Sequence, residues 1–239
     1  MDDLELYEQF KDLSLRFPKL SLEKDGDGLW SVHGDLRFSA IFSGHQIDDQ
    51  YSIKITIPKK YPDVLPKIQE TANLIPGDFH HYQDDSLCLG APIAVRYKFK
   101  KEPTLVGFVY NCVIPYLYSF SYKIKFGKMP YGELSHGTLG ILEYYEDLFD
   151  MKDRRRIVRM IQILAEDNYR GHDRCPCGSG KRLRSCHGKV LRELMALQSP
   201  AEFISEYNLI IKYGSLGIGV VAPIYGGVKW QEKRSKTRP

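Results

Sequence analysis

The first part of the chain alternates hydrophobic and polar residues with the period of β-strands. Within 51–57, three isoleucines recur at every second position with polar residues between them, which is typical of a half-buried strand. Shorter runs of the same kind cover 29–32 and 36–42, and the His-Gly-Asp sequence at 33–35 predicts a tight hairpin between them. With a further strand expected within 66–71, the pattern predicts a four-stranded antiparallel meander.

Helical spacing of hydrophobic residues predicts the elements around these strands. An apolar face over 6–17 predicts a first helix, which Asp2 or Asp3 can cap and which Pro18 ends. Later helical patterns cover 104–118 (kinked or split at Pro115), 138–149, 154–168 and 189–197, with a loop at 126–137 and a packed strand and turn at 214–227. The predicted fold class is therefore α+β.

Size and composition fit a folded domain with an appendage. The chain has 239 residues, of which 43% are hydrophobic and 27% are charged. An acidic start at Asp2 and Asp3 is unlike a signal peptide, and the apolar stretch at 209–228 is broken by a lysine and several glycines. Five cysteines, an odd number with three of them clustered beside a histidine, are unlike a disulfide framework. We expect a cytoplasmic protein.

Positive charge is concentrated in the second half of the chain. The formal net charge is only +4, but basic residues gather at 154–159, at 170–189 and at 229–238. Any attraction for polyanions therefore belongs to the C-terminal part. Contact with nucleic acid or the ribosome is one interpretation, although aromatic residues are not interleaved with the basic ones as in a nucleic-acid reading surface.

A cluster of cysteines predicts a metal site. Cys175, Cys177, Cys186 and His187 fall within thirteen residues and offer three thiolates and one imidazole, the donors that zinc prefers in a tetrahedral site. Glycines at 178, 180 and 188 permit the tight backbone that such close ligands demand. Four protein ligands leave no open position for water, so the predicted zinc is structural rather than catalytic.

The spacing of these ligands resembles the SEC-C motif. The Cys-x-Cys and Cys-His pairs of 175–187 match that motif almost residue for residue. It is known from the C-terminus of the preprotein translocase motor and from many bacterial proteins. The resemblance implies a small zinc-binding module that docks to a partner protein or to the ribosome.

A second resemblance involves the segment that follows the predicted strands. A loop with three prolines at 58–66 is followed by His80 and His81, and then by Cys88 just before a Gly-Ala-Pro turn at 90–92. This order resembles the core of ubiquitin-conjugating enzymes. The resemblance implies their fold, with an N-terminal helix, a four-stranded meander and C-terminal helices. It also implies that Cys88 carries a ubiquitin-like modifier as a thioester.

The resemblance also suggests roles for residues near Cys88. His80 matches the family's histidine, and His81 and His136 are further candidates for the catalytic site. The family has an oxyanion-stabilising Asn where this chain reads His80-His81-Tyr82, so Gln83 or a backbone N–H would have to donate instead. The alternative interpretation of the histidines is that they only hold the loop by hydrogen bonds.

The aspartates near Cys88 and the two cysteines outside the metal cluster have open or structural interpretations. Asp84 and Asp85 are candidate proton acceptors for the amine, together with His136. A cysteine between leucines is commonly a small core residue, and Cys88 differs only by its sequence context. Cys112 lies on an apolar helical face and is predicted to belong to the core.

These observations divide the chain into three parts. Residues 1–168 are expected to form a ubiquitin-conjugating-like catalytic domain, 169–190 the zinc-binding motif, and 191–239 a helix, a Gly-rich segment and a basic tail. The segment 132–137 resembles a pattern in the bacterial branch of the family, which occurs in antiviral operons of the CBASS type beside a cyclic-oligonucleotide synthase. That synthase's C-terminus is thought to stand in for ubiquitin.

The resulting hypothesis is an acyltransferase of bacterial antiviral defence. Cys88 would form a thioester with the C-terminal carboxyl of a partner protein, such as the synthase, and transfer it to an amine. No glycine-rich phosphate loop follows a predicted strand, so a separate activating enzyme is expected as a further partner. The alternative is a non-catalytic adaptor that uses the same fold and the zinc module to bind a partner.

Overall fold

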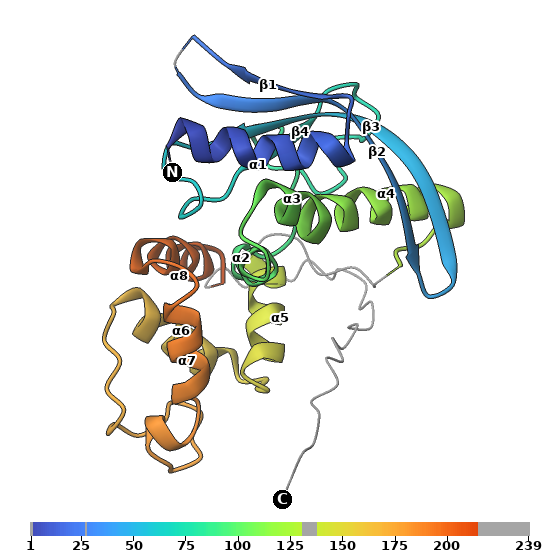
Figure 1. The fold of residues 1–239 in the computed structure, drawn as a ribbon. Coiled ribbons are helices and arrows are strands. Elements are labelled where there is room, and N and C mark those ends of the chain that lie inside the picture. The colour runs from blue at the N-terminus through green and yellow to red at the C-terminus, as the bar shows by residue number, and fades with distance from the viewer. Residues whose placement is uncertain (1, 27, 131–137, 215–239) are drawn as a thin grey trace, which may run out of the picture.

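The computed structural model of the chain describes residues 2–26, 28–130 and 138–214 (Figure 1). The fold is α+β with a four-stranded antiparallel sheet in the order β1-β2-β3-β4, as predicted. The strands predicted at 29–32 and 36–42 are however one strand, and the fourth strand is β1, which was not predicted. The strands are β1 (Leu20–Lys24), β2 (Trp30–Phe42), β3 (His45–Ile57) and β4 (Lys67–Glu70). Each strand therefore pairs with the next one along the chain.

The predicted hairpin at 33–35 is wrong. Gly34 lies in the middle of the long strand β2, where it pairs with Leu20 of β1 and with Ile53 of β3. Its φ of +130° is open only to glycine, and a Cβ added there would lie 2.2 Å from the carbonyl oxygen of Lys19. The glycine permits the close approach of another backbone segment, and the turn into β3 lies instead at Ser43 and Gly44, both with positive φ.

The helices beside the sheet follow the predicted order but differ in length. α1 (Asp3–Arg16) begins at the N-cap Asp2, whose carboxylate accepts a hydrogen bond from the Glu5 N–H as predicted. The second predicted helix runs further than 118, through α3 (Leu105–Phe108), a π-helical turn (Val109–Val113) and α4 (Ile114–Phe126). Pro115 stands in the first turn of α4, where its missing N–H is tolerated, and Gly127 in the left-handed conformation ends the helix.

A helix that the sequence did not predict connects the two halves of the molecule. α2 (Pro92–Lys100) begins at the proline of the supposed 90–92 turn. Val95 and Phe99 pack into the first hydrophobic core, with the sheet, α1, α3 and α4. Ala91 and Ile93 belong to a second core. In Figure 1, α2 accordingly lies between the sheet-bearing part and the remaining helices.

The second core is built by the C-terminal helices. These are α5 (Thr138–Leu148), α6 (Arg154–Ala165), a short 3-10 turn (Leu183–Ser185), α7 (Gly188–Met195) and α8 (Pro200–Gly214). The helical patterns predicted at 138–149, 154–168 and 189–197 are confirmed within a few residues. Buried side chains from all four α-helices pack together, including Tyr145, Ile161, Leu191 and Phe203. Cys175 is part of this core, which ties the cysteine cluster to the helices.

Two predictions fall where the structure gives no description. His136 and, apart from Gly214, the segment 214–227 lie outside the described residues. Within the described ranges, no helix is long and apolar enough to cross a lipid bilayer. All five cysteines lie in described segments, and none of them forms a disulfide.

Candidate metal centre and candidate thioester cysteine

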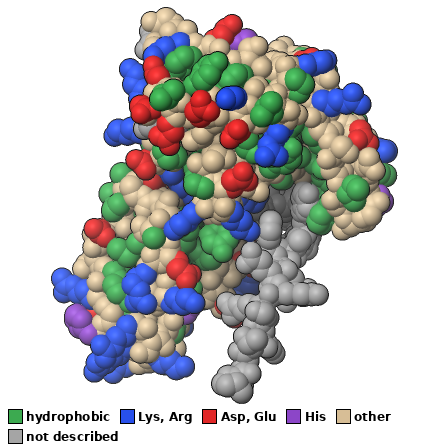
Figure 2. All heavy atoms as spheres, viewed as in Figure 1, with side chains coloured by type: hydrophobic (Ala, Val, Ile, Leu, Met, Phe, Trp, Pro, Cys, Tyr) green, Lys and Arg blue, Asp and Glu red, His purple; other side chains and the backbone are tan. Residues whose placement is uncertain are grey.

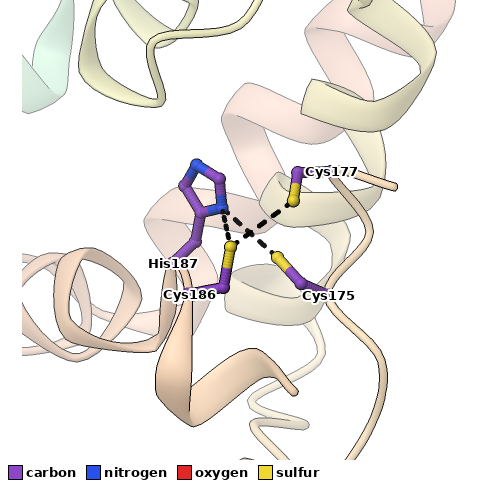
Figure 3. Close-up of side chains that lie close together, drawn as sticks. All are labelled: Cys175, Cys177, Cys186 and His187. Atoms are coloured by element: carbon purple, nitrogen blue, oxygen red, sulfur yellow. Dashed lines mark hydrogen bonds between the residues drawn. The ribbon is translucent and has the colours of Figure 1, made fainter. Parts of the chain in front are cut away.

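The four predicted ligands come together in space. One donor atom from each of Cys175, Cys177, Cys186 and His187 lies within 4.8 Å of all the others. Figure 3 shows the four side chains pointing toward one another, with His187 Nδ1 3.3 Å from the Sγ atoms of both Cys175 and Cys186. The Sγ atoms of Cys177 and Cys186 are 3.5 Å apart. The group could therefore hold a metal ion.

Backbone hydrogen bonds shape the loop that carries the first two cysteines. The Cys175 N–H donates to the Lys181 carbonyl at 2.9 Å, and the Gly178 N–H donates to the Cys175 carbonyl at 3.2 Å. Gly178 has a φ of +79°, and a Cβ added there would lie 2.5 Å from the Arg156 guanidinium. Arg156 in turn donates to the Cys177 carbonyl, so α6 braces the loop from outside. The positive φ favours glycine at 178, and any larger side chain there would also displace the Arg156 guanidinium.

The ring of His187 is oriented by its second nitrogen. Nε2 lies 3.0 Å from the carbonyl oxygen of Phe149, and it can only donate to that acceptor. The Nδ1 atom that faces the three sulfurs is then unprotonated and free to bind a metal, the usual arrangement of a metal-binding histidine. Phe149 directly follows α5, and its ring also meets the His187 ring edge-on at 6.1 Å. This contact connects the cluster to α5.

The thiols of the cluster have shifted pKa values. Burial raises the pKa of Cys175 to about 12, and hydrogen bonds to the neighbouring thiols contribute. Burial also opposes ionisation of Cys177, but hydrogen bonds from Ser179 and from the other two thiols outweigh it and lower its pKa to about 6. The sulfurs thus interact strongly with each other, and a bound cation would favour thiolate at all three.

Cys88 lies on a short hairpin at the edge of the sheet. Its N–H donates to the His80 carbonyl at 2.7 Å, and the Tyr82 N–H donates to the Ser86 carbonyl at 2.8 Å. The Leu87 N–H donates to the carbonyl of Ile68 in β4 at 2.8 Å, which fixes the hairpin to the sheet. Cys88 is partly exposed, whereas Cys112 is only 1% exposed and lies in the predicted core position.

Tyr82 is a neighbour of Cys88 that the sequence analysis did not identify as functional. Because His80 pairs with Cys88, Tyr82 is the diagonal cross-strand neighbour of the cysteine, and the Cys88 thiol interacts electrostatically with its hydroxyl. Partial burial raises the pKa of the Tyr82 phenol, and the thiol and Asp84 raise it further. Tyr82 therefore keeps its proton at neutral pH and can donate a hydrogen bond. Its place after His80-His81, where ubiquitin-conjugating enzymes have a donor Asn, was the available signal.

Two of the three candidate histidines, His80 and His81, lie in the described part of the chain and make contacts that hold the hairpin. His80 has a φ of +47°, and its carbonyl accepts from the Cys88 N–H and from the Tyr116 hydroxyl. His81 Nδ1 lies 2.8 Å from the Phe79 carbonyl oxygen. The structure thus brings the His80 backbone next to Cys88, and the His81 ring next to the backbone of Phe79. The contacts of His136 are not described.

The two aspartates of the hairpin differ in their surroundings. Asp84 pairs with Lys67 and accepts from the Ser86 hydroxyl and N–H, and these contacts hold the pKa of its carboxyl well below the usual range. A carboxylate held in this way is a weak proton acceptor. Asp85 is exposed at the hairpin tip with a φ of +59°. Asp84 is therefore engaged in holding the hairpin together, whereas Asp85 faces solvent.

Comparison with known proteins adds no relative. No protein-family model matches the chain, and no curated protein matches its sequence. The resemblances to the SEC-C motif and to ubiquitin-conjugating enzymes therefore depend on the residues and spacings described above, together with the order of the helices and strands.

Proposed function

We propose that the protein is a ubiquitin-conjugating-like acyl carrier that forms a thioester at Cys88. The observation that carries the proposal is the position of this cysteine. It is partly exposed on a hairpin that is hydrogen-bonded to the edge of a four-stranded meander, and it has a protonated phenol beside its sulfur. The order of an N-terminal helix, four sequential strands and later helices supports the same fold family.

The residues around Cys88 suit acyl transfer in two steps. In the first step the Cys88 thiolate attacks an activated C-terminal carboxyl of the donor protein, the C–S bond forms and the activating group leaves. In the second step an amine attacks the thioester carbonyl, the C–S bond breaks and the thiolate departs. In this proposal the Tyr82 hydroxyl donates to the oxyanion that forms in each step, and Asp85, at the exposed tip of the same hairpin, accepts the proton of the amine.

The proposed donor is a protein with a free C-terminus, delivered by a separate activating enzyme. The sequence pattern at 132–137 favours a cyclic-oligonucleotide synthase of a bacterial antiviral operon in this role. This assignment rests on the resemblance to the bacterial branch alone.

The proposed metal is a structural zinc held by Cys175, Cys177, Cys186 and His187. Three sulfurs and one imidazole nitrogen, with the ring fixed by the Phe149 carbonyl, fit this ion. Four protein ligands would leave no open position on the zinc for a substrate, so its role would be structural. Zinc bound here would stabilise the folded loop and the start of α7. The ligand residues close the 175–187 loop against α5 and α6, away from the acyl chemistry.

Intact-mass analysis of a serine variant tests the acyl carrier. Cys88→Ser is co-expressed with the cyclic-oligonucleotide synthase proposed as donor and with its activating enzyme. The expected product is an oxyester between Cys88→Ser and the synthase, whose mass is the sum of these two proteins less one water. Cys112→Ser is the matched control and should keep a thioester that hydroxylamine cleaves. Absence of any adduct on Cys88→Ser, with both partners present and folded, would rule out this function.

A second candidate function is a non-catalytic adaptor, which the absence of the family's Asn favours. The two are separated by the alkylation rate of Cys88 relative to glutathione, since Cys112 is too buried to serve as the reference. A carrier should react several-fold faster than its accessible surface predicts, and Tyr82→Phe should slow it by about two- to fivefold because the thiolate loses a donor. An adaptor should show a slow rate that Tyr82→Phe leaves unchanged.

A further inference from the structure

A groove lies where the sheet-bearing part meets the C-terminal helices. It has a volume of about 520 Å³ and runs between α2 and α7. Tyr97 and Lys100 line it from α2, and Lys189 and Arg192 line it from α7. The Lys100 ammonium also donates to the backbone carbonyl of Ala196, the C-cap of α7, at 3.5 Å, so α2 contacts the end of α7 across one end of the groove.

The charges that line the groove are mostly positive. Among the described lining residues, Lys100, Lys189 and Arg192 contribute three cations and Glu193 one anion, which pairs with Lys189 at 3.9 Å, so the net charge of the lining is positive. Lysine and arginine side chains also gather over the lower part of the molecule, where α6 and α7 lie (Figure 2). A concave surface with one sign of charge concentrates the field and attracts groups of opposite charge.

Arg192 is held in place rather than free to move away. Its guanidinium donates to the Tyr169 hydroxyl at 2.7 Å and stacks over the Tyr169 ring at 5.6 Å. The same hydroxyl would lie 2.5 Å from a Cβ at Gly188, which shows how closely the start of α7 packs on it. A fixed cation loses less entropy on binding an anion than a flexible surface lysine does.

The groove also has apolar parts. Tyr97 is 45% exposed, and Ala196 and Leu197 line the end beyond α7. An aromatic ring and aliphatic side chains next to cations suit a peptide that carries both acidic and hydrophobic side chains. Nucleic acid fits less well because three cations and one exposed aromatic ring are too few to follow a phosphate backbone and to stack its bases.

We propose that this groove binds an acidic, partly hydrophobic segment of a partner protein. The cations hold the carboxylates of the segment, and Tyr97 with Leu197 receives its hydrophobic side chains. The proposal does not depend on chemistry at Cys88, because it concerns binding at a separate surface.

Fluorescence anisotropy with a synthetic peptide tests the groove. The probe is a fluorescein-labelled peptide of alternating glutamate and leucine, and the expected result is binding that weakens as salt is raised. Lys100→Glu with Lys189→Glu should weaken binding by at least about tenfold. Glu193→Lys should tighten it by about two- to fivefold. Both α7 positions are exposed. Lys189→Glu breaks the exposed ion pair with Glu193, a small cost, while its negative charge in the first turn of the helix is favourable.

A matched control places the same charge change elsewhere. Lys59→Glu with Lys60→Glu alters two exposed lysines just after β3 and should change peptide affinity by less than about twofold. Equal weakening by both double variants would overturn the proposal, since the attraction would then be diffuse. The proposal also fails if a glutamine–leucine peptide binds as tightly, if no peptide binds, or if a single-stranded RNA binds the groove more tightly than the peptide.

Discussion

The same residue type has different chemistry at different positions of this fold. Cys88 is partly exposed beside the Tyr82 hydroxyl, whereas Cys112 is 1% exposed on the π-helical turn. Burial raises the pKa of Cys112 to about 11, which keeps it as an unreactive thiol at neutral pH. The hairpin hydrogen bonds, and not the identity of the residue, make Cys88 the candidate nucleophile.

Two glycines of β2 and its following turn are expected to differ sharply when replaced. Gly34→Ala should lower the free energy of unfolding by about 3 kcal/mol, because the new Cβ meets the Lys19 carbonyl oxygen and φ is unfavourable for alanine. Gly44→Ala should cost about 1 kcal/mol, since it has a positive φ but open space around it. Urea denaturation measures both, and equal losses would contradict the close-approach role of Gly34.

Buried Glu206 predicts a pH-dependent stability. Burial raises its pKa above the ordinary 4.5, although hydrogen bonds from Tyr145 and Gln198 partly oppose this. The folded state therefore binds the proton more tightly than the unfolded state. Its contribution to stability is complete below about pH 4.5 and is lost as pH rises through the folded-state pKa.

Glu206→Gln should remove that dependence. The variant's free energy of unfolding, minus that of the natural protein, should increase as pH rises from below 4.5 and level off above the folded-state pKa. Denaturation at a series of pH values gives this difference. Glu8→Gln, an exposed position on α1, serves as the control and should show a flat difference. A difference that falls with pH would show that Glu206 is stabilised as the anion.

The metal-binding group was predictable from sequence, while the surroundings of Cys88 were not. Four soft or borderline ligands within thirteen residues must lie close together in any compact loop, and the structure confirms that they do. The Tyr82–Cys88 contact depends on the register of the 80–88 hairpin, which pairs His80 with Cys88. That register is fixed by the bond from Leu87 to Ile68 of β4, a contact that local sequence does not reveal.

At the level of whole elements, regular hydrophobic periodicity predicted strands and helices correctly, whereas a glycine and a proline led to wrong predictions of turns. Strict alternation located β3, since every second side chain of 51–57 is buried. β1 was not predicted because its alternation is too short: only Leu20 and Leu22 are hydrophobic, and two charged residues follow them. Gly34 and Pro92 were both interpreted as turn residues. Gly34 instead lies within β2, where it allows the Lys19 backbone to approach closely, and Pro92 is the first residue of α2.

Removal of the proposed zinc should loosen particular elements and leave the sheet intact. His187 is the N-cap of α7 and contacts the Phe149 carbonyl at the end of α5, so both helix ends depend on its position. After chelation, hydrogen exchange should accelerate in the loop at 175–187, in α7 and at the end of α5. Protection in β2 and β3 should stay the same. Cys186→Ser should reproduce this pattern, and a uniform loss of protection would contradict a local role for the metal.

At the scale of the whole molecule, α2 couples the two hydrophobic cores. Its side chains alternate between them, with Ile93 in the second core and Val95 and Phe99 in the first. The buried Arg96 of α2 also forms an ion pair with Glu202 of α8. Cys88 lies four residues before the start of α2, so the packing of the C-terminal helices reaches the hairpin through a short and rigid path.

This coupling predicts that a substitution in the second hydrophobic core alters the reactivity of Cys88, which lies beside the first core. Ile93→Ala should cost about 2–4 kcal/mol of stability and should raise the alkylation rate of Cys88 in the native state, because α2 no longer holds the end of the hairpin. Leu13→Ala is the matched control: its side chain is equally buried, but in α1 against the first core. It should cost a similar free energy and leave the rate unchanged. Equal rates in the two variants, measured well below their melting temperatures, would show that the hairpin is held by the sheet alone.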